Sequence, residues 1–211
     1  SYLFAKKLKH GINEIGDWKL FEPSRFIYSF FAFNMIYEIN WEITLSRKYL
    51  WDQRKAKTHT KLYYFIKFLY NFYDVKDFCL IFKEYGSIDS LISNVDQIQK
   101  DPNISRINRC SELDVQNSFI DNYRIAINRL DKNSFGQTDH YHLLAFTYQI
   151  RNNIFHGYKT VGMMTLREQR ARLIDYTNII LVTLEQFYDM LATNYGYIRA
   201  SDYELTENID N

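Results

Sequence analysis

The sequence predicts an all-helical protein, an up-and-down bundle of five or six helices. Breakers are scarce, with 2 prolines and 7 glycines in 211 residues, whereas an all-β chain needs a turn roughly every ten residues. No segment alternates apolar and polar residues over the length of a strand, and apolar residues recur at helical spacing instead. A hydrophobic fraction of 46% is ample for a buried core, which excludes a wholly disordered chain.

Capping residues and breakers divide the chain into the expected helices. Ser87 and Thr138 are good N-cap residues, and Thr165 opens a capping-box sequence with Glu168. The residues 133–136, Asn-Ser-Phe-Gly, predict a turn. The expected helices run over about residues 23–50, 60–84, 87–101, 113–130, 138–156 and 165–194.

We expect one domain over residues 1–211, because no linker, repeat or low-complexity tract divides the chain. Its core is expected over about 23–85 and 113–196, with 86–112 as an insertion that holds the helix at 87–101, and 197–211 as an acidic tail. No apolar run reaches the roughly 18 residues of a membrane span. The first residues also lack the apolar segment of a signal peptide, so we expect a cytoplasmic protein.

One segment, residues 151–158, carries a chemical pattern: Arg-Asn-Asn-Ile-Phe-His-Gly-Tyr. An arginine five residues before a histidine is a weak signal alone, since Arg54 and His59 have the same spacing. Context separates the two pairs. Arg54 and His59 lie in a polar, basic connection, whereas Arg151 and His156 close a helix with a predicted inward face, formed by Leu143, Ile150 and Ile154.

Helical geometry gives the predicted site its shape. Asn152 and His156 are four residues apart and share one face of the helix. Arg151 lies about 140° round the helix from His156, and its long side chain reaches the cleft that His156 borders. The helix end favours a protonated imidazole, and Gly157 then lets the chain turn away.

These residue types suit the cleavage of RNA by its own 2′-hydroxyl. A histidine that titrates near neutral pH manages protons. A guanidinium binds two phosphate oxygens and stabilises the charge of the transition state. Asn152 positions the phosphate or fixes the imidazole tautomer. The segment offers no carboxylate cluster for a metal, and Cys79 and Cys110 lack metal-type spacing, so we expect no metal and no cofactor.

The string at 151–158 resembles the motif of the HEPN superfamily, in which an arginine and a polar residue precede a histidine. The Asn after the Arg and the Gly after the His are also similar. The aromatic segment 25–34 looks like the first helix of such domains. The resemblance covers about residues 23–50 and 113–195, and it implies a HEPN-like bundle that forms a homodimer, with two Arg/His pairs in one composite cleft.

The resemblance implies an endoribonuclease that leaves a 2′,3′-cyclic phosphate and a 5′-hydroxyl, in a toxin–antitoxin, abortive-infection or other defence or stress system. Other members of the superfamily have lost catalysis and bind RNA, a nucleotide or a partner protein. That alternative stays open here, as does a coincidental motif in a helical interaction protein. Tyr158 extends the pattern to that of HEPN toxins whose tyrosine is adenylylated by an antitoxin of the nucleotidyltransferase type. A packing role for this tyrosine is the other interpretation.

Basic and polar residues elsewhere are further candidates for contact with RNA. Seven basic residues and one acid lie between residues 47 and 67, beside Trp51, Tyr63 and Tyr64, which are able to stack on bases. Asn34 interrupts an aromatic helix and needs a polar partner, either at the catalytic site or on the local backbone. Solvated helix surfaces explain the basic residues almost as well. The candidates are Asn34, Arg54, Lys55, Lys57, Lys159, Arg167 and Arg170.

His140 and His142 open the helix that carries the motif. Side chains two residues apart point to different faces of a helix, which is poor geometry for a shared metal. We therefore expect these two histidines to be surface or capping residues.

Overall fold

The computed structural model describes residues 21–38, 58–98, 116–155 and 161–195. Within these ranges the regular elements are helices, which confirms the all-helical prediction. They are α2 (Phe21–Tyr37), α4 (Thr58–Leu69), α5 (Val75–Tyr85), α6 (Ile88–Ile98), α7 (Phe119–Asp131), α8 (Gln137–Phe155), α9 (Val161–Met164) and α10 (Arg167–Tyr195). None of the helices in this part of the chain is long and apolar enough to cross a membrane.

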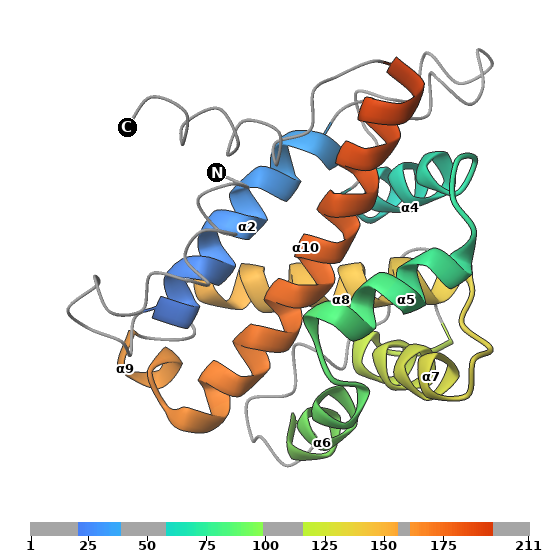
Figure 1. Ribbon diagram of the computed structural model, residues 1–211. Helices are drawn as coiled ribbons and strands as arrows, with labels where there is room; N and C mark the ends of the chain where they lie inside the picture. The colour runs from blue at the N-terminus through green and yellow to red at the C-terminus, as the bar shows by residue number, and fades with distance from the viewer. Residues whose placement is uncertain (1–20, 39–57, 99–115, 156–160, 196–211) are drawn as a thin grey trace, which may run out of the picture.

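The longest helix, α10, organises the bundle. Figure 1 shows it running diagonally across the molecule, with α2 alongside it and α8 crossing behind. Helices α5 and α6 pack against α10 on the other side, and α7 packs against α8. The core lies where α2, α8 and α10 meet, and it buries Phe26 and Phe30 from α2 and Phe146 from α8. The predicted inward face of α8 is confirmed at Leu143 and Ile150, whereas Ile154 is half-buried.

The expected single helix over 60–84 is two helices, and this prediction was wrong. Helix α4 ends at Leu69 and α5 begins at Val75. Asp74 caps α5, since its side chain accepts a hydrogen bond from the backbone N–H of Lys76 at 3.0 Å. The Asp77 carboxylate accepts from the backbone N–H of Asp74 at 2.9 Å, which completes a capping box. No glycine or proline lies at this break, so a prediction from helix-breaking residues does not locate it. The described residues therefore hold eight helices, counting the short α9, where five or six were predicted.

Several predicted helix starts are shifted. Ser87 does cap α6, as its hydroxyl accepts from the N–H of Ser90 at 3.3 Å. The helix expected from about residue 113 begins at Phe119, where the Ser118 hydroxyl accepts from the Asp121 N–H at 3.2 Å. Thr138 lies inside α8, not before it. The Thr165 hydroxyl donates to the carbonyl of Gly162 at 2.8 Å instead of capping α10, because the short α9 turn precedes it.

The predicted surface position of His140 was also wrong. His140 is fully buried, and its two ring nitrogens join α8 to two other parts of the bundle. The Thr183 hydroxyl of α10 donates to the Ile179 carbonyl at 2.8 Å, so it accepts from His140 Nε2, also at 2.8 Å. His140 Nδ1 then accepts from the hydroxyl of Tyr70, in the α4–α5 connection, at 2.9 Å. These bonds assign the neutral tautomer with the proton on Nε2. They hold α8, the helix that carries Arg151, in register with α10.

Candidate functional site

Arg151 lies in the last turn but one of α8, against the side of α2. Three aromatic rings surround its guanidinium carbon. The Phe155 ring centre is 4.3 Å away, the Phe30 centre 5.7 Å and the Tyr148 centre 5.9 Å. Tyr148 and Phe155 come from the same helix, three residues before and four residues after Arg151, which places all three on one face. The rings hold the cation by cation–π contact and limit the rotamers open to it.

The guanidinium of Arg151 has no carboxylate partner within ion-pair distance among the residues that the structure describes. Its Nη1 donates to the side-chain oxygen of Asn152 at 3.0 Å. Its Nε is buried and has no hydrogen-bond partner in the same part of the chain. A cation that is fixed by rings and one amide keeps its charge available to an anion, because no carboxylate of the described residues neutralises it.

Tyr37 links Asn34 to this arginine. The Tyr37 hydroxyl donates to the Asn34 side-chain oxygen at 2.5 Å, so the partner of Asn34 is neither the backbone nor Arg151 itself. The Tyr37 ring centre lies 6.2 Å from that of Tyr148, which touches Arg151. Burial raises the pKa of Tyr37, and the nearby Arg151 guanidinium opposes the shift. Asn34 is therefore connected to the arginine only through Tyr37 and Tyr148.

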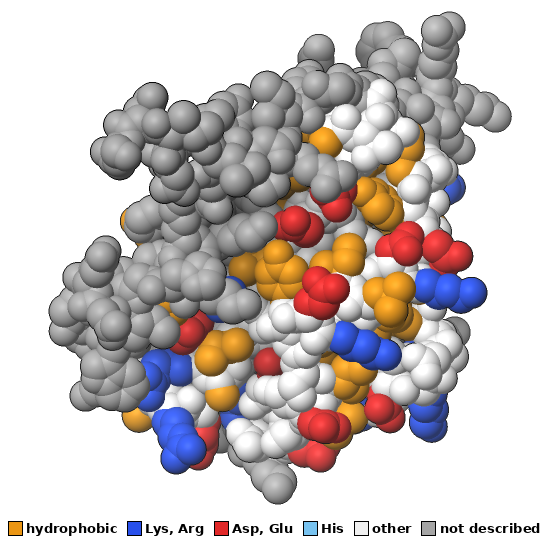
Figure 2. Space-filling view, viewed as in Figure 1, with side chains coloured by type: hydrophobic (Ala, Val, Ile, Leu, Met, Phe, Trp, Pro, Cys, Tyr) orange, Lys and Arg blue, Asp and Glu red, His pale blue; other side chains and the backbone are white. Residues whose placement is uncertain are grey.

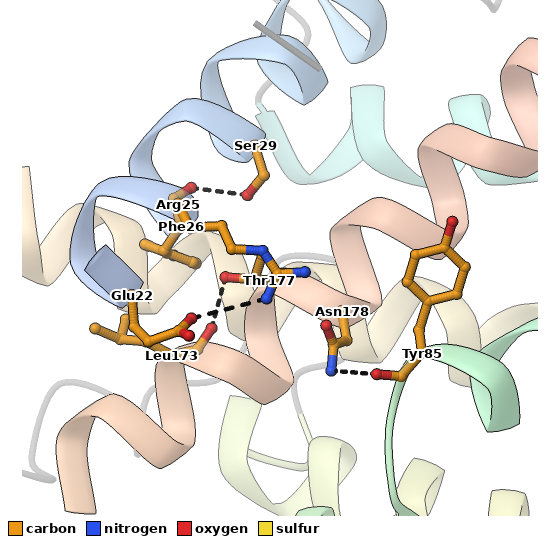
Figure 3. Close-up of polar contacts among 8 residues, drawn as sticks. All are labelled: Glu22, Arg25, Phe26, Ser29, Tyr85, Leu173, Thr177 and Asn178. Carbon is orange, nitrogen blue, oxygen red and sulfur yellow. Dashed lines mark hydrogen bonds and ion pairs between the residues drawn. The ribbon is translucent and has the colours of Figure 1, made fainter. Parts of the chain in front are cut away.

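Arg25 provides a contrast to Arg151 on the opposite side of α2. It is buried at the α2–α10 contact and lies 3.8 Å from the carboxylate of Glu22 (Figure 3). Burial lowers the pKa of Arg25 and raises that of Glu22, while each partner opposes the other's shift. The charge of Arg25 is therefore balanced within the fold. Arg151 has no such carboxylate partner among the residues that the structure describes.

Other predicted site residues divide into two groups. Arg167 lines a groove of about 400 Å³ between α10 and the polar face of α6. Arg170 lies near Glu22 of α2, since its charge lowers the pKa of that carboxyl. The groups that surround Arg151, Asn152 and three rings, include neither arginine. The remaining candidates lie outside the described residues: Arg54, Lys55, Lys57, His156, Tyr158 and Lys159.

The surface over α5 and α10 adds no second basic site. Figure 2 shows acidic and basic side chains interspersed among hydrophobic ones on the described part of this face. Groups of three or more metal-ligating side chains are absent from the part of the chain that the structure describes.

Sequence reasoning found Arg151 and missed the rings around it. The signal was present in part, because Tyr148 and Phe155 stand at helical spacing from Arg151. The contribution of Phe30 depends on how α2 crosses α8, and no local pattern encodes that crossing. Comparison of the chain with protein-family models, with curated proteins and with solved structures finds no match. The case for a functional site therefore depends on the surroundings of Arg151 and on the sequence motif at the end of α8.

Proposed function

We propose that this chain is a metal-independent endoribonuclease with a HEPN-like bundle, in which Arg151, Asn152 and His156 act on the phosphodiester. The observation that supports this most is the Arg151 guanidinium, fixed among three rings without a carboxylate partner in the described residues. A cation in that state suits a phosphate in a partly dry site, where it stabilises the developing negative charge.

The reaction follows from the residue types. The 2′-hydroxyl of the substrate attacks the adjacent phosphorus, and the bond to the 5′-oxygen breaks. His156 transfers the protons of this reaction, which leave the attacking 2′-hydroxyl and reach the departing 5′-oxygen, since an imidazole titrates near neutral pH. Arg151 stabilises the equatorial phosphate oxygens, and Asn152, bound to Arg151 Nη1, orients the guanidinium. The products are a 2′,3′-cyclic phosphate and a 5′-hydroxyl.

The wider proposal follows the motif. A homodimer brings two copies of the Arg/His pair into one cleft, and the enzyme serves in the cytoplasm in a toxin–antitoxin, abortive-infection or other stress system. Tyr158 would then be the residue that a nucleotidyltransferase-type antitoxin modifies. Lys159 and the basic residues Arg54, Lys55 and Lys57 would track the RNA backbone.

The test is cleavage of single-stranded RNA by purified protein in EDTA. Arg151→Ala and His156→Ala are each expected to lower the rate at least about 100-fold, the scale of losing one charge-stabilising or proton-transferring group. Arg124→Ala, a half-buried arginine of α7 that pairs with Asp121 at 3.7 Å, and His59→Ala are matched controls that leave the rate unchanged. Replacing the 2′-hydroxyl at the scissile nucleotide by hydrogen must abolish cleavage. Undiminished cleavage by the His156 variant would contradict the proposal.

A second candidate is a non-catalytic module that binds RNA, a nucleotide or a partner protein at the same arginine. The observation in its favour is that Arg151 is already engaged by Asn152 and three rings, an arrangement that suits binding as well as catalysis. Binding that depends on Arg151, without cleavage of any of several RNAs, would select it.

A further inference from the structure

Three aromatic side chains of the α2–α8 side remain exposed, and together they form what we call the aromatic ridge: Tyr28, Phe31 and Phe155. Their exposed fractions are 40%, 43% and 44%. The ring centres of Tyr28 and Phe31 are 6.4 Å apart, and those of Phe31 and Phe155 are 5.9 Å apart. Each of these pairs packs edge to face, at 79° and 61°. The rings therefore form one contiguous cluster from two helices, with ring faces at different angles, and are not isolated exposed residues, which are common and carry no meaning.

The aromatic ridge ends at the arginine of the candidate site. The Arg151 guanidinium carbon lies 4.3 Å from the centre of the Phe155 ring and so covers one face of it. Phe155 nevertheless keeps almost half of its surface exposed. Aromatic surface thus extends outward from a cation that lacks a carboxylate partner among the described residues.

This combination selects a ligand with two chemical parts. The cation binds an anion such as a phosphate, and the rings pack against flat, apolar π-surfaces a few ångströms away from that anion. Nucleotides of an unpaired strand have both parts, because their bases are free to stack while the backbone carries the charge. A duplex hides its base faces, and a free phosphate leaves the ridge uncovered.

We infer that the aromatic ridge is a base-stacking platform, on which unpaired bases beside the phosphate held at Arg151 stack. This inference rests on the proposed function for the identity of the nucleic acid. Bases next to the bound phosphate stack on Phe155 and Phe31, and Tyr28 extends the platform by one more ring. Phe31 is a binding residue in this arrangement and takes no part in the chemical step.

The test compares binding of two uncleavable oligomers by fluorescence anisotropy: a single-stranded 2′-O-methyl oligonucleotide, and an abasic oligomer with the same backbone. The protein is expected to prefer the oligomer with bases. Phe31→Ala should weaken binding of that oligomer between about 5-fold and about 100-fold, the range measured for loss of a stacked ring. The same variant should leave binding of the abasic oligomer unchanged, and Phe31→Trp should keep the preference for bases. Phe72→Ala is the matched control, since Phe72 is an aromatic residue with 39% exposure after α4.

The outcomes separate this inference from the proposed function. Loss of RNA cleavage in Arg151→Ala, with equal binding of both oligomers by the protein and by Phe31→Ala, would overturn the platform and leave the ribonuclease standing. Absence of cleavage with a Phe31-dependent preference for bases would support the platform and remove the enzyme. Sedimentation equilibrium tests whether another protein chain, and not RNA, covers the aromatic ridge. A smaller particle mass in Phe31→Ala, with both oligomers weakened equally, would identify the ridge as a protein interface and refute base stacking.

Discussion

Two buried titratable side chains, His140 and Asp175, are expected to give the stability of this protein opposite responses to acid. His140 is fully buried between Tyr70 and Thr183. Asp175 of α10 is 2% exposed and accepts hydrogen bonds from Ser90 at 3.1 Å and from the Asn94 side chain. Burial lowers the pKa of His140 from 6.5 to about 3 and raises that of Asp175 from 3.8 to about 6.

For His140 the unfolded chain binds the proton more readily than the folded protein. Between pH 6.5 and pH 3 the unfolded state therefore gains protons that the native state does not take up, and stability falls as the pH falls through this window. From pH 7 to pH 4 the loss is about 3 kcal/mol, at about 1.4 kcal/mol for each pH unit below 6.5.

For Asp175 the sign is reversed. Its folded-state pKa is the higher one, so the ionised carboxylate destabilises the native state above pH 6, and this penalty is relieved as the pH falls from 6 towards 3.8. From pH 7 to pH 4 the relief is about 2 kcal/mol by the same conversion. The two effects partly cancel in the native protein, which is why single variants are needed to reveal them.

The assay is urea denaturation followed by far-ultraviolet circular dichroism, at pH 7 and at pH 4. His140→Gln removes the imidazole, so its loss of stability from pH 7 to pH 4 is expected to be about 3 kcal/mol smaller than that of the native protein. Asp175→Asn keeps an acceptor for Ser90 and removes the charge, so its loss is expected to be about 2 kcal/mol larger. Equal pH dependence of His140→Gln and the native protein would refute the assignment of a neutral, fully hydrogen-bonded imidazole.

Three local features allow further predictions. Both polar atoms of the buried Gln186 amide lack a hydrogen-bond partner among the described residues, so Gln186→Met is expected to raise the free energy of unfolding by about 1 kcal/mol or more in urea titrations; a fall would contradict this. Gly86→Ala is expected to cost about 1–3 kcal/mol in the same measurement, because the new Cβ meets the Phe82 ring at 3.0 Å and the Asn178 amide at 3.2 Å. Ser118→Ala removes the N-cap of α7 and is expected to lower the thermal midpoint, with a loss of about 1 kcal/mol, whereas Ser118→Asp should keep most of the stability.

The sequence was sufficient where the cause is local. The scarcity of breakers and the spacing of apolar residues predicted helices, and Ser87 marked the start of α6. The break predicted at 133–136 does lie between α7 and α8, with the turn itself at residues 132–133. Asn133 adopts a φ of 54°, in the left-handed region that asparagine tolerates. These features depend on residues within a few positions of one another, so local sequence patterns are enough to predict them. The role predicted for Arg151 stays a prediction, to be tested by the cleavage assay.

Only the tertiary structure decided which polar groups are buried and what surrounds each described cation. His140 was expected at the surface because its partners, Tyr70 and Thr183, are 70 and 43 residues away and no local signal connects them. Arg25 pairs with Glu22, three residues before it in the same helix, whereas Arg151 is enclosed by rings of which one, Phe30, comes from another helix. The Phe30 contact arises from how α2 crosses α8. The packing of helices that are distant in sequence sets the surroundings of a charged side chain. Those surroundings determine whether its charge is balanced inside the protein or is open to a ligand.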